Sequence, residues 1–266
     1  MEFTANEAVL RHDQSDKNPM TKILMTLLLL AGGAAEAAPA VNRFYGYAYD
    51  LKSNKYLYTE VHEQHVDGDR WFGGTIKYYA PDGAPIASKT LDFHADPFIP
   101  VFRLDIPKEG YVEAITEVGK DSFKMLKTND GNTRTATVQK VPGMAADSGF
   151  HNAIVAHFDE LRAGKTLKFK FAVAGQLDVY SFRCRKTGDI TIDGKQGMKL
   201  LIEPDSLLRL LAGPLDVVYD VANKHLLDYR GTSNMHDPAT GKAYNAHIIY
   251  PDQPPKDAPK NLPPLQ

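Results

Sequence analysis

The feature that most constrains this chain is an alternation of apolar and polar residues that runs from Phe44 onward. It is clearest over residues 165–173, where every second side chain from Leu167 onward is apolar. The apolar set is Leu167, Phe169, Phe171 and Val173, and the lysines between them are Lys168 and Lys170. Successive side chains of a strand point to opposite faces, so this stretch has one dry face and one wet face. The pattern predicts antiparallel sheet with a solvated side.

Turn-forming residues separate the alternating stretches, for example Pro81-Asp82-Gly83, Asn129-Asp130-Gly131 and Asp193-Gly194. Between these turns lie short runs rich in Tyr, Phe, Val, Ile and Thr, as hairpin-connected strands require. We expect about a dozen strands from this spacing.

Two helices interrupt the strand pattern. The first follows Asp147 and Ser148, which suit a helix N-terminus, and ends at Gly164. Its apolar side chains are Phe150, Ile154, Phe158 and Leu161, and their helical spacing predicts that one face packs against the sheet. A second, shorter helix is predicted over residues 204–212. The expected fold is mainly β, a large curved antiparallel sheet (half-barrel or barrel-like) packed on one amphipathic helix, with a second short helix.

Residues 20–37 have the form of a secretory signal peptide, with a basic residue, an apolar run and a small-residue cleavage site. The apolar run is shorter than the roughly 20 residues that span a bilayer. We therefore expect cleavage near Ala37, export to the periplasm and a mature protein without a transmembrane segment. Residues 1–19 are interpreted as a mis-called start or a vector remnant. Residues 38–250 are expected to form a single domain, and residues 251–266, with six prolines, a disordered tail.

Charge and cysteine content narrow the classes of partner. Residues 1–37 carry three of the 31 basic and five of the 33 acidic residues, so the mature chain is electrically balanced. Such a balance argues against binding the phosphate backbone of nucleic acid. Cys184 is the single cysteine, so no internal disulfide forms and core burial must stabilise the fold. Cys184 is interpreted as a small strand residue, with a reactive thiol between Arg183 and Arg185 as the alternative.

The sequence carries no motif that is typical of catalysis, nucleotide binding or metal binding. His62 and His65 are three residues apart in a predicted strand, so they point to opposite faces and cannot easily share a metal. No Gly-x-Ser-x-Gly elbow and no phosphate-binding glycine loop is present. We expect no metal, no cofactor and no catalytic residue. A Ser-His-Asp triad assembled from distant loops stays open, because triads are defined by geometry.

Aromatic residues are the remaining signal. Most rings in the predicted strands belong to a core. A curved sheet closed by an apolar helix also commonly leaves a cleft that holds lipids or other apolar ligands. Core packing and ligand lining both remain open for these side chains. The candidate ligand-lining set is Phe150, Ile154, Phe158, Phe169, Phe171 and Phe182.

Two C-terminal runs, residues 213–220 and 226–234, resemble an uncharacterised family of exported bacterial β-sheet proteins. The segment 148–151 that leads into the first helix fits the same resemblance. These motifs are turn and strand patterns, so the resemblance implies a fold and a location but no active site. More loosely, the expected half-barrel is similar to periplasmic lipoprotein-localisation carriers, which hold acyl chains in their cleft.

The leading functional hypothesis is a soluble periplasmic protein, not an enzyme, that binds an apolar or amphipathic envelope ligand such as a lipid. A second hypothesis is an envelope scaffold that recognises a protein partner through a strand edge or the proline-rich tail. A third is a hydrolase of an envelope polymer. Its clustered candidates are Asp147, Ser148 and His151 near the start of the first helix.

Overall fold

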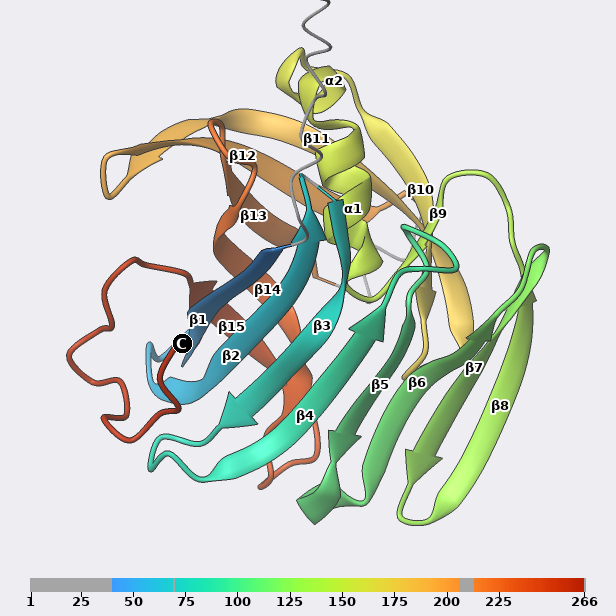
Figure 1. Ribbon diagram of the computed structural model, residues 1–266, viewed down its shortest axis with the longest axis horizontal. Helices are drawn as coiled ribbons and strands as arrows, with labels where there is room; N and C mark the ends of the chain where they lie inside the picture. Colours follow the sequence, from blue (N-terminus) through green and yellow to red (C-terminus); the bar gives the residue numbers. More distant parts are fainter. Residues whose placement is uncertain (1–39, 69, 206–212, 266) are drawn as a thin grey trace, which may run out of the picture. The chain divides into compact units, whose positions relative to one another are not determined.

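The computed structural model describes residues 40–68, 70–205 and 213–265, which build one large sheet curved around a pair of short helices (Figure 1). The predicted fold class is confirmed, because the protein is mainly β and its curved sheet is not closed. The sheet has 15 strands, a few more than the sequence spacing indicated. Its pairs are antiparallel except for β9 and β10, which run parallel.

The strands up to the middle of the chain are β1 (Ala40–Asp50), β2 (Tyr56–Asp67), β3 (Arg70–Tyr79), β4 (Pro85–Asp92), β5 (Val101–Ile106), β6 (Tyr111–Val118), β7 (Ser122–Asn129), β8 (Asn132–Gln139) and β9 (Met144–Ala146). A 3-10 turn, η1 (Pro107–Glu109), joins β5 to β6, and the helices α1 (Gly149–Ala156) and α2 (Phe158–Arg162) follow β9. The remaining strands are β10 (Leu167–Val173), β11 (Asp178–Ile192), β12 (Lys195–Pro204), β13 (Leu215–Asp220), β14 (Leu226–His236) and β15 (Ala243–Ile249).

Neighbours in the sheet are neighbours in the chain, with one exception. The first strand β1 pairs with the last strand β15, so the two edges of the sheet are β8 and β9 from the middle of the chain. Tight hairpins make this order possible. Asp130 and Gly131 have φ of 49° and 74°, and Asp193 and Gly194 have φ of 48° and 79°, as two-residue turns with two left-handed residues require.

The strand register gives the concave face two different walls. One row of paired residues crosses β1 to β7 and includes three cationic or acidic side chains and a histidine; we call it the polar row. It consists of Phe44, His62, Ile76, Lys89, Leu104, Glu113 and Lys127. A second row, the apolar row, crosses β12 to β1 and consists of Leu200, Val217, Tyr229, Ile248 and Ala48. These two rows therefore offer different chemistry to the space between them.

The helix predicted after Ser148 is present, but it is broken at His157 into α1 and α2. Its apolar face, with Ile154 and Phe158, packs against β11 to β13, where Cys184 is fully buried. The start of α1 is tied to the opposite wall, because Asn152 Nδ2 donates to the carbonyl of Pro97 at 2.8 Å and to that of Trp71 at 3.2 Å. The helix thus bridges the two walls on the inside of the curve (Figure 1).

Several sequence predictions fall on residues that the structure does not describe. Residues 1–39 include the predicted signal peptide and the segment before it. The second predicted helix also lies mostly outside the described residues, since β12 continues to Pro204 and residues 206–212 are not described. Within the described ranges, no helix has both the length and the apolar character needed to cross a membrane.

The proline-rich segment 251–265 forms no helix or strand, and it contacts β1 and the β11–β12 hairpin through side-chain interactions. The Tyr45 hydroxyl donates to the carbonyl of Pro263 at 2.5 Å, and the Tyr49 hydroxyl donates to Asp257 Oδ1 at 3.0 Å. An ion pair of 2.7 Å joins Lys195 to Asp252 near the beginning of the segment. These contacts hold the segment against β1 and the β11–β12 hairpin.

Candidate functional site

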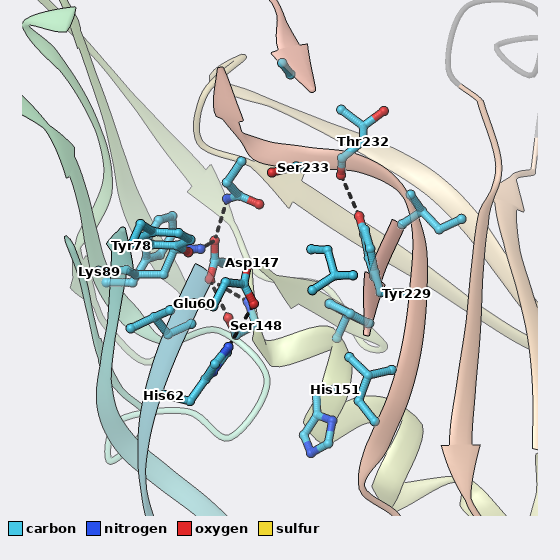
Figure 2. Close-up of a pocket in the computed structure, with 18 of the residues that line it drawn as sticks. Glu60, His62, Tyr78, Lys89, Asp147, Ser148, His151, Tyr229, Thr232 and Ser233 are labelled. Atoms are coloured by element: carbon cyan, nitrogen blue, oxygen red, sulfur yellow. Dashed lines mark hydrogen bonds and ion pairs between the residues drawn. The ribbon is translucent and has the colours of Figure 1, made fainter. Parts of the chain in front are cut away.

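A cavity of about 1550 Å³ opens between the two walls and the start of α1 (Figure 2). Members of the polar row, including His62 and Lys89, lie on one side of it, and Tyr229 of the apolar row lies on the other. The lining also reaches Tyr45 and Leu265 beside the C-terminal segment, so the concave side holds only part of this volume. Even so, ligand pockets are typically about 300–1,000 Å³, and this space suffices for a small amphiphile.

A buried ion pair forms the centre of the polar side. Lys89 Nζ lies 2.7 Å from Asp147 Oδ2, and each side chain is only 4% exposed. Asp147 has φ of 44° at the turn between β9 and α1, a left-handed conformation that Asp tolerates better than most residues. Its other oxygen accepts hydrogen bonds from the amide and hydroxyl of Ser148 at 2.6 and 2.8 Å. The turn therefore aims the carboxylate at Lys89.

The protonation of Asp147 follows from these contacts. Burial on its own would raise the pKa of this carboxyl group, because it disfavours the charged form. The charge of Lys89 and the hydrogen bonds from Lys89 and Ser148 outweigh burial and hold the pKa below its usual value. Asp147 is therefore an ionised partner for the lysine.

A second buried acid, Glu113, completes this polar cluster. Its Oε2 accepts from the Tyr111 hydroxyl at 3.0 Å, and its Oε1 accepts from Asn234 Nδ2 at 2.9 Å. The same Asn234 amide lies 3.2 Å from Asp147 Oδ2. Burial raises the pKa of Glu113, Lys89 opposes that shift and Asp147 adds to it. Asn234 thus joins the two acids across the cavity from β14.

Glu60 and His62 form a carboxylate–imidazole pair on β2. His62 Nε2 lies 2.8 Å from Glu60 Oε2, which also accepts from the Tyr250 hydroxyl at 3.2 Å. Phe44 stacks on the imidazole with ring centroids 4.5 Å apart. His62 Nδ1 is buried and has no hydrogen-bond partner among the described residues. The Nε2–H group of His62 donates to Glu60, so His62 Nδ1 is the one ring nitrogen of this pair without a hydrogen bond.

The three residues considered for hydrolysis are not arranged as a catalytic relay. The Ser148 hydroxyl donates to Asp147, while His151 Nδ1 lies 3.2 Å from the Tyr219 hydroxyl. In the described part of the chain, Ser148 and His151 are joined by a backbone hydrogen bond of 3.1 Å but by none between the hydroxyl and the imidazole. Burial, together with His225 and His62, lowers the pKa of His151 to about 4. His151 is neutral near pH 7 and packs between the rings of Trp71 and Tyr219.

Four of the six candidate ligand-lining residues line the cavity and form one aromatic cluster. Phe169 and Phe182 lie with centroids 6.0 Å apart, and Phe171 lies 6.0 Å from Phe182 and 6.5 Å from Phe150. All four rings are only partly buried. We call Phe150, Phe169, Phe171 and Phe182 the phenylalanine cluster. That these rings contact a ligand stays a prediction.

The other two candidates, Ile154 and Phe158, occupy a different place. Each is 2% exposed and packs in the core between the helices and β11 to β13, away from the cavity lining. Helical spacing placed them correctly on the sheet-facing side of the helix. Helical spacing alone did not show that Phe150, in the first turn, faces the cavity while the apolar side chains of the following turns are buried in the core.

Sequence reasoning missed the charged members of the site, Lys89 and Glu113. The sequence does contain a signal for both residues, since each stands at a position of an alternating strand where an apolar residue is expected. Lys89 lies between Ala87 and Leu91 on the buried face of β4, and Glu113 lies on the same face of β6 as Tyr111. A charged residue at such a position must find a buried partner. The partners themselves come from distant segments and leave no trace in the local sequence.

Metal binding and thiol chemistry find little support in the described ranges. No group of three or more His, Cys, Asp or Glu side chains there is arranged to hold a metal ion. His65 pairs with Glu63 at 3.2 Å, on the opposite strand face from His62. Burial raises the pKa of Cys184 to about 12, which disfavours a reactive thiolate.

Comparison with known proteins adds a likeness of fold. No family model matches the sequence, and no curated protein matches it. The structure is similar to the crystal structure of a beta-barrel-like protein of a domain of unknown function, DUF1849, from Brucella abortus. The two share 10% sequence identity, the likeness covers 80% of this chain and 98% of the other, and the TM-score is 0.46. No statement about the chemistry of the cavity follows from it.

Proposed function

We propose that the protein binds an amphipathic ligand in the concave cavity and serves as a carrier in the periplasm, not as an enzyme. The observation that carries this proposal is that one side of the cavity is lined by apolar side chains and the other side by buried charged side chains. The partly exposed phenylalanine cluster lies at one side, and the buried cluster of Lys89, Asp147 and Glu113 lies at the other. A ligand with an apolar chain and a polar head matches both.

The phenylalanine cluster supports an apolar chain as part of the ligand. A fully buried phenylalanine side chain gains roughly 1.5–3 kcal/mol over an exposed one, so four partly exposed rings in one hollow leave free energy available for binding. The segregation of the polar groups supports a head group. A purely apolar ligand would leave the polar cluster of the cavity without a match.

Trp71 provides a direct test, because it is the single tryptophan of the chain and lines the cavity. Titration with single-chain amphiphiles below their micelle concentration should change its fluorescence in a saturable way. Replacing Phe169 and Phe171 together by serine should weaken binding at least about tenfold. Phe72→Ser is the matched control, since Phe72 is partly buried on β3 and lies outside the cavity lining. Equal affinity in the double variant and the control would overturn the proposal.

Native mass spectrometry on protein purified from the periplasm without detergent tests the same proposal in the cell. A stoichiometric adduct that organic solvent extracts as a lipid would support a carrier and name the ligand class. Recovery of the protein from the cytoplasm with its first residues uncleaved would contradict the proposed location.

A further inference from the structure

The polar side of the cavity presents hydrogen-bond donors that lack acceptors. Tyr78 lines the cavity and is 3% exposed, yet its hydroxyl bonds to no other described residue. Among the described residues, His62 Nδ1 is the side-chain nitrogen or oxygen that is fully buried and has no hydrogen-bond partner. The Tyr78 hydroxyl is not sealed in this way, so it reaches the open space of the cavity. Tyr78 and Lys89 are diagonal neighbours on one face of β3 and β4, and both line the cavity with Asp147 (Figure 2).

Lys89 adds further donors at the same place. Its ammonium group has three N–H bonds, and one of them is directed to Asp147 Oδ2 at 2.7 Å. The ring of Phe102 lies 5.6 Å from Nζ and offers a cation–π contact but no oxygen acceptor. In the described part of the chain no second oxygen accepts from this buried ammonium. A ligand oxygen between Tyr78 and Lys89 would satisfy both groups.

The charges around this point restrict what that oxygen belongs to. Asp147 accepts four hydrogen bonds, from Ser148, Lys89 and Asn234, and its charge is compensated by Lys89. Glu60 is the cross-strand partner of Tyr78 on β2, and Glu113 lies in the same row as Lys89; both carboxyl groups line the cavity with Tyr78. An anionic head group would meet these carboxylates at close range, and Coulomb repulsion in a buried site is strong. A quaternary ammonium head has no acceptor to offer the two donors.

We infer that the ligand's head group is uncharged and carries a carbonyl or hydroxyl oxygen that accepts hydrogen bonds from Tyr78 and Lys89. This inference rests on the proposed function and narrows it to neutral amphiphiles such as acylglycerols. The chain of the ligand extends to the phenylalanine cluster. Tyr78 determines specificity in this arrangement, because its hydroxyl has no structural partner.

The test compares three probes with the same saturated chain, monolauroylglycerol, laurate and dodecyltrimethylammonium, by titration of Trp71 fluorescence. Monolauroylglycerol should bind at least about tenfold more tightly than either charged probe. Tyr78→Phe should weaken its binding roughly fivefold, the effect of one hydrogen bond. Tyr79→Phe is the matched control, because Tyr79 follows in the same strand, points to the opposite face and lies outside the cavity lining.

A second readout separates a hydrogen bond from a change in packing. The ester carbonyl stretch of isotope-labelled monolauroylglycerol should lie at lower frequency when bound to the native protein than when bound to Tyr78→Phe. Urea unfolding of Tyr78→Phe should match that of the native protein, since no hydrogen bond within the fold is lost.

The outcomes distinguish this inference from the proposal beneath it. If all three probes bind with equal affinity, or if Tyr78→Phe changes neither affinity nor carbonyl frequency, the neutral head group is wrong and the carrier proposal stands. If laurate binds most tightly, the site is anionic-selective and the inference is overturned. If no probe binds and native mass spectrometry shows no adduct, the carrier proposal itself fails.

Discussion

Lys89 Nζ and Asp147 Oδ2 lie 2.7 Å apart although 58 residues separate them in the chain. The pair joins β4, which contributes Lys89 to the polar row, to the turn from which α1 starts. Both side chains are almost fully enclosed, so each depends on the other for compensation of its charge. The helix start and the polar side of the cavity are therefore fixed by one interaction.

Replacing Lys89 by methionine should destabilise the fold by about 3–5 kcal/mol, because it leaves the Asp147 carboxylate buried without its cation. The measurement is urea unfolding at neutral pH. Lys140→Met is the matched control, since Lys140 and Asp96 form an ion pair of equal length, 2.7 Å, with side chains 17% and 20% exposed. The control should lose clearly less stability. Equal losses of stability in the two variants would mean that the deeper burial of the Lys89–Asp147 pair does not increase its contribution to stability.

Phe158 and Phe171 should respond differently to truncation. Phe158→Ala removes a fully buried ring and should lower the free energy of unfolding by about 3–5 kcal/mol. Phe171→Ala removes a partly exposed ring, so we expect a smaller loss of stability and a larger loss of amphiphile affinity. Urea unfolding and Trp71 titration of both variants check this. The reverse order would show that the aromatic cluster is core and not ligand lining.

Truncation after Tyr250 should lower stability, although a disordered tail would be dispensable. The deletion removes the acceptors of the Tyr45 and Tyr49 hydroxyls, which are worth about 2 kcal/mol together at a typical 1 kcal/mol each. Thermal unfolding of the truncated and full chains measures the loss. The double variant Tyr45→Phe and Tyr49→Phe is the control for the hydrogen bonds alone. An unchanged melting temperature would show that the segment contributes nothing to the fold.

The contacts of residues 251–265 with the sheet affect how the carrier and the scaffold hypotheses can be separated. Loss of function on deleting residues 251–266 would not by itself identify a docking tail, because the deletion also removes contacts of the sheet. A substitution that exposes no buried residue, such as Lys256→Ala in the same segment, distinguishes docking from folding.

The fold was predictable because the alternation is local. Leu167, Phe169 and Phe171 lie on the inner face of β10 as their spacing indicated, and the helix begins after Ser148 as predicted, although Ser148 makes no side-chain capping hydrogen bond. The pairing of β1 with β15 was not predictable, since it joins the two ends of the domain and depends on how far the sheet curves.

The site was predictable only on its apolar side. Aromatic residues are recognised as candidates from their residue type. Lys89 and Glu113 are of types that usually occupy solvated strand positions, and only their place on the apolar face of an alternating strand distinguishes them. Their partners Asp147 and Asn234 come from the helix start and from β14. The contacts of residues 251–265 were not predictable either, because the tyrosines of β1 that bind this segment are distant in sequence.

His151 should make stability depend on pH in the mildly acidic range. Its pKa is about 4 in the folded protein against an ordinary value of 6.5, so between these values the unfolded chain binds a proton that the folded protein does not. Stability from this residue is complete above about pH 6.5 and is lost as the pH falls towards 4. The loss amounts to at most about 3 kcal/mol, an upper bound because His151 is not fully enclosed. His151→Phe keeps a ring between Trp71 and Tyr219 and removes the titrating group. Urea unfolding of both proteins from pH 4 to pH 7.5 should show a steeper decline in the native protein, and parallel profiles would mean that His151 titrates normally in the fold.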